Sequence, residues 1–333
     1  MARVLLLSAT PPDDEDEEHL APLRDLQTRA ARDRFRAHAV TSDAEAADVI
    51  LFVESYGAGW HFERVRCHTL MRKYREKCFL FSSNTFVIPF LPGIYTAIEK
   101  QWASRRTVGG FYLGTPQNEL RTFTHPTADL PQLYSFVGSL RNAPVRRELA
   151  KLDHPRGFIQ DTAAEYERVL QRAIQPEERR NYYRRYADAT KRSKFVLCPR
   201  GLSASSVRLF ETMEMGRVPV ILSDGWVEPP GPAWPSFSIR VPENEWVGIP
   251  EILEQREREA PAMGELARAT WLEWFSEEAA FHRVVEWCLA IKEQRILPEE
   301  LARFTAYLHY LQPFQFRRAV GDKIRSLRGR PQL

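Results

Sequence analysis

The chain has 333 residues, which is more than one hydrophobic core usually holds and favours two domains. Hydrophobic residues make up 44% and charged residues 27%, a composition typical of globular rather than disordered or fibrous proteins. The 47 basic and 44 acidic side chains nearly cancel, which argues against a nucleic-acid partner. The four cysteines are far apart, without a CxxC pair or zinc-ligand spacing, so we expect no metal site.

The amino terminus lacks the pattern of a targeting segment. The apolar run after Met1 is shorter than a signal peptide requires, and the acidic run Asp13–Glu18 follows where a cleavage site would be. That acidic run is typical of a solvated surface rather than of a metal site. No later run approaches the roughly 20 apolar residues that span a bilayer. These features lead us to expect a cytoplasmic protein.

Short apolar runs alternate with helical stretches in the first part of the chain. Unbroken apolar runs are typical of parallel strands that are buried on both faces. Their alternation with helices indicates a doubly wound α/β domain. Strands are expected at 4–7, 48–53 and 78–82, with helices at 20–36 and 62–76 between them.

The alternation begins again after a proline- and threonine-rich passage at 116–131. Further strands are expected at 133–137, 157–160, 194–198 and 218–222, with helices from about 144, at 177–191 and at 206–215. We therefore predict an α/β protein with two Rossmann-like domains. The first covers 1–125 and the second 126–295, and a C-terminal helical segment over 296–333 crosses back to the first.

The segment from Phe195 to Glu211 carries the features of an anion site. Ligands of open α/β sheets bind beyond the carboxyl ends of the strands, where helix N-termini favour negative charge. Arg200 and Gly201 make the turn after a buried strand, and Ser206 supplies a hydroxyl at the start of the next helix. A phosphate group suits this layout.

Arg208 and Glu211 are three residues apart and share a face of that helix. One interpretation is a surface ion pair, worth at most about 1 kcal/mol. The other is that Arg208 joins Arg200 in holding a diphosphate, while Glu211 accepts hydrogen bonds from ribose hydroxyls. The spacing alone leaves both interpretations open.

This part of the chain resembles the exostosin-type glycosyltransferases, glycosyltransferase family 47. The resemblance rests on FVLCPRG at 195–201, SVRLFE at 206–211 and GRVPVILSDGWVEPP at 216–230, with FVGSLR at 136–141 upstream. It implies a GT-B fold, in which two Rossmann-like domains face each other across a cleft. It also implies inverting, metal-independent transfer from a nucleotide-diphosphate sugar, which we expect to be a UDP-sugar, without any other cofactor.

The resemblance places Arg200, Arg208 and Glu211 in the donor pocket, with Gly138 and Arg141 near the diphosphate. Trp226 follows a buried strand, and we favour a role as a wall of the same pocket over a role in packing alone. The expected acceptor is a glycan or a lipid-linked glycan. The alternative function is that of a non-catalytic subunit of a glycosyltransferase pair, which binds a glycan or a nucleotide sugar.

Inverting transfer needs a base that takes the proton of the acceptor hydroxyl. Glu54, at the carboxyl end of an expected strand, is the first candidate, and His61 is the next. A capping or surface carboxylate is the competing interpretation of Glu54.

The segment from Phe314 to Arg330 combines spaced apolar residues with six basic residues and one acid. One interpretation is a terminal helix that packs back on the first domain. The other is a basic helix that rests on anionic lipid, where each Lys or Arg contributes about 1 kcal/mol. The second would suit an enzyme whose acceptor is lipid-linked.

Overall fold

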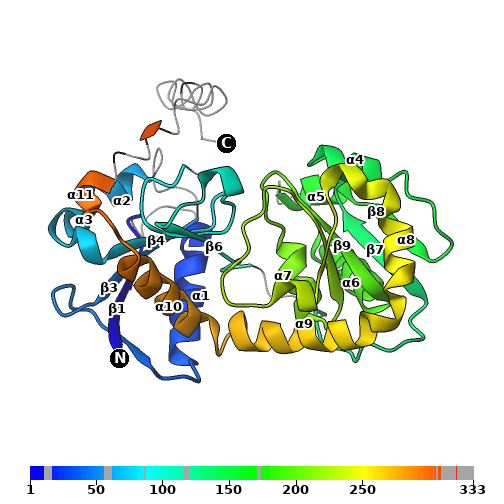
Figure 1. The fold of residues 1–333 in the computed structure, drawn as a ribbon, viewed down its shortest axis with the longest axis horizontal. Helices are drawn as coiled ribbons and strands as arrows, with labels where there is room; N and C mark the ends of the chain where they lie inside the picture. The colour runs from blue at the N-terminus through cyan, green and yellow to red at the C-terminus, as the bar shows by residue number, and fades with distance from the viewer. Residues whose placement is uncertain are drawn as a thin grey trace. The chain divides into compact units, whose positions relative to one another are not determined.

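The chain forms two compact α/β units (Figure 1). The computed structural model describes residues 1–10, 17–55, 62–85, 88–115, 120–170 and 174–302, together with 304, 307, 308 and 320. Unit 1 comprises 1–115, 227–229 and 277–333, and unit 2 comprises 116–226 and 230–276. Each unit has its own parallel sheet with helices packed on it, so the predicted class of two Rossmann-like domains, as in GT-B proteins, is confirmed.

Unit 1 is built on a six-stranded sheet in which every neighbouring pair is parallel. Its strands, in spatial order, are β2 (His38–Val40), β1 (Ala2–Leu7), β3 (Val49–Glu54), β4 (Cys78–Ser82), β5 (Gly93–Tyr95) and β6 (Thr107–Gly109). Every residue of β3 and β4 is buried, as expected for central strands with helices on both faces.

The helices of unit 1 are shorter than the sequence predicts. They are η1 (Glu17–Leu20), α1 (Ala21–Ala31), α2 (Glu63–Cys67), α3 (Thr69–Lys73), η2 (Arg75–Lys77), η3 (Lys100–Trp102), α10 (Ala280–Glu293) and α11 (Glu299–Ala302). The prediction of one helix over 62–76 is wrong. The chain is extended at His68, whose Nδ1 accepts a hydrogen bond from the amide of Leu70 at 3.2 Å and so begins α3 as a separate helix.

Unit 2 is built on a five-stranded parallel sheet. Its strands, in spatial order, are β11 (Ile239–Arg240), β10 (Val218–Leu222), β9 (Ser193–Pro199), β7 (Gln132–Gly138) and β8 (Gly157–Asp161). Its helices are α4 (Pro144–Leu149), α5 (Ala163–Leu170), α6 (Pro176–Lys191), α7 (Val207–Glu214), η4 (Trp234–Ser236), η5 (Glu243–Gly248), α8 (Ile249–Gln255), η6 (Glu257–Glu259) and α9 (Ala260–Trp274).

Both sheets have the same doubly wound order, in which the first and third strands are neighbours. In unit 1 these strands are β1 and β3, and in unit 2 they are β7 and β9. The crossovers run in opposite directions from this switch point, which opens a crevice beyond the carboxyl ends of the two strands. Glu54 ends β3 and Gly138 ends β7, so both sheets place a predicted site residue at their switch point.

The chain returns to unit 1 at Glu277, whereas the sequence placed all of 126–295 in the second domain. The reason is α10, whose buried side chains include Phe281 and Val285 and which packs against α1 and β5 (Figure 1). The first division also lies earlier, between residues 115 and 116 rather than after 125.

No helix in the described ranges is both long enough and apolar enough to cross a bilayer. The basic tail, 314–330, lies outside the described residues apart from Val320.

Arg217 connects the segment around Thr124, near the start of unit 2, to the core of that unit. Its side chain is 1% exposed and donates hydrogen bonds to the carbonyl oxygens of Thr124 at 2.7 Å and Lys191 at 2.7 Å, and to the Thr124 hydroxyl at 2.6 Å. Burial lowers the pKa of Arg217 to about 10, so the guanidinium stays charged at neutral pH. One buried cation thus ties together three segments of the unit.

We expect Arg217→Met to lower the free energy of unfolding by about 3 kcal/mol or more, because the carbonyl groups that accept from the guanidinium would lose their partner in the core. Denaturant unfolding followed by tryptophan fluorescence measures this loss. Arg192→Met is the matched control, because Arg192 is exposed at the end of α6, and its loss should stay within about 0.5 kcal/mol. Equal losses in the two variants would contradict the structural role of Arg217.

Candidate functional site

Most of the predicted donor-binding residues gather at the switch point of unit 2. They are Gly138 at the end of β7, Arg141 in the loop after it, Arg200 and Gly201 after β9, Ser206 at the start of α7, and Arg208 and Glu211 on α7. The side chain of Arg141 is exposed, and those of Ser206 and Arg208 are buried. The parallel sheet brings these residues together from the loops after β7 and β9 and from α7.

Arg146, on α4, bridges the two strand ends at the switch point. Its guanidinium donates to the carbonyl oxygens of Ser139 at 3.1 Å, Pro199 at 3.3 Å and Arg200 at 2.7 Å. The side chain is 7% exposed and lies over the ring of Phe136. Arg146 therefore holds the loop after β7 to the loop after β9. The sequence predicted a helix from about residue 144, but the predicted site did not include Arg146.

Arg208 is a buried cation that forms no ion pair with a carboxylate in the described part of the chain. Its side chain is 9% exposed, and Nη2 donates to the carbonyl oxygen of Val137 at 2.6 Å. The guanidinium lies 4.5 Å from the centre of the Phe136 ring and 5.6 Å from that of Tyr186. Nε has no hydrogen-bond partner among the described residues. A buried charge without a counter-ion is costly, and an anionic ligand placed beside it would lower that cost.

A second buried polar atom at the start of the same helix is also without a partner. The Oγ atom of Ser205 makes no hydrogen bond among the described residues, and Ser205 is 3% exposed. Ser206 is the N-cap residue of α7, but its side chain makes no capping hydrogen bond. Hydroxyl groups in this state can donate to the oxygens of a ligand.

The two glycines of the site let the guanidinium groups approach the backbone. A methyl group at Gly138 would come within 2.4 Å of Nη2 of Arg208, and one at Gly201 within 3.2 Å of Nη2 of Arg146. The first contact is closer than real side chains allow, so Gly138 is required for the observed position of Arg208. The second is tight and leaves little freedom to the loop.

Glu211 pairs with Arg121 and not with Arg208. Its Oε1 lies 2.5 Å from Nη1 of Arg121, and both side chains are largely buried. Burial opposes the charge of Arg121, but Glu211 and Glu214 outweigh it and raise the pKa of the guanidinium. Burial and the Glu211 carboxylate also raise the pKa of Tyr186. The ion pair considered for Arg208 and Glu211 is therefore absent, because Arg121, far away in the sequence, takes the carboxylate.

Arg200 lies at the edge of the unit 2 site, whereas Trp226 lies in the interior of the unit. The amide of Arg200 donates to the carbonyl of Leu222 at 2.9 Å, and its Nη1 lies 3.9 Å from Oε1 of Glu243. The side chain of Arg200 is about one quarter exposed, at 24%. Trp226 is only 1% exposed and packs edge-on against Trp234 at 4.9 Å. Its ring belongs to the aromatic core of unit 2.

Glu54 occupies the switch point of unit 1 as a fully engaged carboxylate. Oε1 accepts from the amide of Ala9 at 2.6 Å, and Oε2 accepts from the hydroxyls of Ser8 at 3.0 Å and Thr10 at 3.3 Å. The side chain is 1% exposed. Burial raises the pKa of Glu54, although the three donors oppose this rise. The geometry is that of a group that anchors the loop after β1. His61 lies outside the described residues.

We expect Glu54→Gln to keep the fold at neutral pH, because the amide has the same shape and the two hydroxyls can rotate to accept from it. Glu54→Ala should lose about 2–4 kcal/mol, because it leaves buried donors unpaired and a cavity behind. A raised pKa means that the folded state holds the proton to higher pH than the unfolded chain does. The stability of the wild type relative to Glu54→Gln should therefore fall as the pH rises above the ordinary value of 4.5.

Denaturation of both variants between pH 4 and 8 tests this prediction. A stability difference between wild type and Glu54→Gln that does not change with pH would contradict the raised pKa.

Comparison with known proteins identifies the part of the chain that carries the unit 2 site. Residues 118–256 match the exostosin GT47 domain. Over 75 residues the chain is 39% identical to an exostosin-1 homolog of Caenorhabditis elegans, covering 22% of this chain and 20% of that protein. Over 85 residues it is 39% identical to a probable glucuronoxylan glucuronosyltransferase of Arabidopsis thaliana, covering 23% and 19%. The matched segments thus span about a fifth of the length of these relatives.

Solved structures with a similar fold have a lower sequence identity to this chain than these relatives have. The crystal structure of MurG from Acinetobacter baumannii has a TM-score of 0.40 at 12% identity and covers 87% of this chain and 99% of that one. The structure of HepE from Anabaena, in complex with UDP, has a TM-score of 0.36 at 10% identity and covers 88% and 99%. Likenesses at these scores carry no argument about site or activity. The sequence match is the more informative comparison, and it shows that residues 118–256 are similar to the exostosin GT47 domain.

Proposed function

We propose that this protein is a glycosyltransferase that moves a sugar from a nucleotide-diphosphate sugar to a hydroxyl group of an acceptor glycan. The proposal is supported by the match to the exostosin GT47 domain and by the name of the Arabidopsis thaliana relative, which is described as a probable glucuronoxylan glucuronosyltransferase. Unit 2, which contains this domain, is the proposed donor-binding unit. A UDP-sugar is the proposed donor, on the resemblance to the family.

The single observation that carries the proposal is the uncompensated charge of Arg208. A diphosphate placed against its guanidinium would supply the missing negative charge and accept from the unpartnered Nε. The Oγ of Ser205 offers a further donor at the start of α7, where the helix dipole adds positive potential. A site with these three features binds a phosphate group better than a neutral ligand.

The proposed reaction inverts the anomeric centre in one displacement. The acceptor hydroxyl attacks the anomeric carbon, the bond from that carbon to the diphosphate oxygen breaks, and its electron pair leaves with the nucleoside diphosphate. Arg208 stabilises the growing negative charge on the leaving group. The hydroxyl proton goes to a base. Glu54 and His61 remain the proposed candidates for this base, and the three hydrogen bonds that Glu54 already accepts favour a structural role for it.

The alternative function is a subunit that binds a glycan or a nucleotide sugar without catalysing transfer. Both functions require the anion site at Arg208, so donor binding does not separate them. Incubation of the purified chain with a panel of nucleotide sugars and short glycan acceptors does. We expect release of a nucleoside diphosphate from one donor and a product that is one sugar longer. Tight nucleotide binding without release or product would favour the binding subunit.

We expect Arg208→Met to weaken the binding of UDP by about 10- to 100-fold, the usual loss when a charged hydrogen-bond partner is removed. The same variant should be as stable as the wild type or more stable, because a neutral side chain replaces a lone buried charge. Calorimetric titration with UDP and denaturant unfolding give the two measurements. Arg147→Met is the control, since this exposed arginine follows Arg146 on α4 and should change neither quantity. Loss of stability without loss of affinity would mean that Arg208 is structural.

Gly138→Ala should also reduce UDP affinity, by about 10-fold, because the new methyl group would displace Arg208 from the carbonyl of Val137. Gly248→Ala is the matched control, because a methyl group there meets only the side chain of Ile252 at 3.8 Å. A Gly138→Ala protein with unchanged affinity would show that the position of Arg208 does not matter for the donor.

A further inference from the structure

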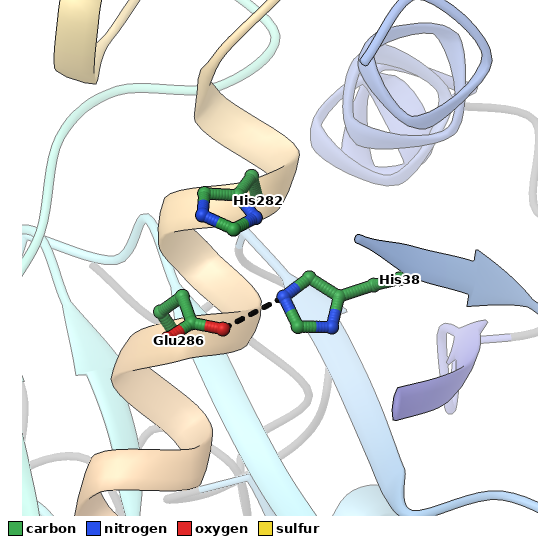
Figure 2. A group of neighbouring side chains, drawn as sticks. All are labelled: His38, His282 and Glu286. Carbon is green, nitrogen blue, oxygen red and sulfur yellow. Dashed lines mark ion pairs between the residues drawn. The ribbon is translucent and has the colours of Figure 1, made fainter. Parts of the chain in front are cut away.

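A cluster of two histidines and one glutamate lies in unit 1, outside the site described above (Figure 2). His38 is the first residue of β2, the strand at the edge of the sheet, and it pairs with Ala2 at the amino end of β1. His282 and Glu286 lie one turn apart on α10, and Figure 2 shows them beside His38. The cluster is therefore at the opposite end of the sheet from Glu54.

The three side chains are held close together by their surroundings. Nε2 of His38 lies 2.8 Å from Oε1 of Glu286, and the side chain of His38 is 5% exposed. The ring of His282 stacks against His38 at 5.0 Å and against Phe35 at 4.2 Å. Nδ1 of His282 is buried and has no hydrogen-bond partner among the described residues. The cluster therefore offers two imidazoles and one carboxylate as ligands for a metal ion, and Nδ1 of His282 is not occupied by a hydrogen bond among the described residues.

We propose that His38, His282 and Glu286 bind a divalent transition-metal ion, for which Zn²⁺ is the best match. Two imidazole nitrogens and one carboxylate oxygen are a common donor set for zinc. The side chain of Glu286 is 48% exposed, so the fourth position of a tetrahedral ion would face water. Calcium and magnesium fit poorly, because they prefer sites made of oxygen ligands.

The distances require only side-chain adjustment. One ligand atom from each residue lies within 4.8 Å of the other two, whereas a tetrahedral zinc ion with bonds of about 2.0–2.1 Å sets its ligands roughly 3.3 Å apart. Glu286 is at the surface and can move by rotation about its side-chain bonds. The contact between Nδ1 of His38 and the amide of Ala2 is long, at 3.4 Å, so ligation through Nε2 disturbs only a weak hydrogen bond.

The location of the cluster suits an ion that stabilises the fold of unit 1. It would join the edge strand β2 to α10, the helix by which the chain re-enters unit 1. The same end of α10 is already connected to the segment before β2, through the ion pair of Arg32 with Glu277 and the hydrogen bond from the amide of Arg34 to the carbonyl of Glu278 at 3.0 Å. A metal ion that binds only the folded unit stabilises it.

Titration of the full chain with zinc chloride, after chelator treatment and removal of the chelator, tests the proposal. Calorimetry should give one site with a dissociation constant in the micromolar range or below, and saturating zinc should raise the thermal midpoint by about 4 °C or more. His282→Ala and Glu286→Gln should each weaken binding at least 10-fold and remove the thermal shift. Glu286→Gln keeps the size of the side chain, so circular dichroism should show an unchanged fold.

Two control variants separate this site from adventitious binding. His154 in unit 2 pairs with Glu254 at 3.1 Å and belongs to no three-residue cluster in the described part of the chain, so His154→Ala should bind zinc like the wild type. Cys67 is an exposed thiol, and Cys67→Ser should also bind normally. The proposal is overturned if the wild type binds no zinc at 100 μM, if either cluster variant binds like the wild type, or if a control variant loses the site. None of these outcomes affects the proposed transferase function.

Discussion

The bridge that Arg146 makes between the ends of β7 and β9 is the interaction on which the unit 2 site depends. Parallel strands that end together leave several carbonyl groups facing the crevice, and a buried carbonyl needs a donor. Arg146 satisfies three of these carbonyls with one planar group. Because the bridge fixes both loops, it also fixes the turn at Gly201 and the point from which α7 begins.

The two switch points treat buried charge in opposite ways. At the switch point of unit 1 the charge is negative, and three donors surround the carboxylate of Glu54. At the switch point of unit 2 the charge of Arg208 is positive, and only one carbonyl and two aromatic rings face it among the described residues. A completed set of partners is what a structural group requires, whereas an incomplete set leaves room for a ligand. This difference is why the donor site is proposed in unit 2.

The long strands could be predicted from the sequence because each is an unbroken apolar run. The limits of β4 and β10 agree with the prediction, and β9 differs from it by one residue at each end. The strands β2, β5, β6 and β11 were missed, because two or three residues are too few to show a pattern. The return of α10 to unit 1 was missed for another reason: an amphipathic helix shows that it packs, but not on which sheet.

The residues that gather at the switch point of unit 2 could be predicted where they are local in sequence. The run from Arg200 to Glu211 carries its own signal, because a buried strand, a turn and a helix start occur together. The partner of Glu211 could not be predicted from the sequence, because Arg121 is 90 positions away. Arg208 is nearer and has the spacing of an ion pair with Glu211. Side chains three apart on a helix can meet, but a buried partner on another segment competes for the same carboxylate.

That competition determines the charge of the site. If Glu211 paired with Arg208, the cation beside Gly138 would be neutralised and its attraction for a diphosphate would largely disappear. Arg121 prevents this, because it takes Oε1 of Glu211 and also lies 3.6 Å from Glu214. Arg121 thus neutralises the carboxylates of Glu211 and Glu214 on α7, while Arg208 on the same helix has no ion-pair partner among the described residues. In the proposed donor site Arg121 would act without touching the donor, because it holds the carboxylate of Glu211 in an ion pair of its own.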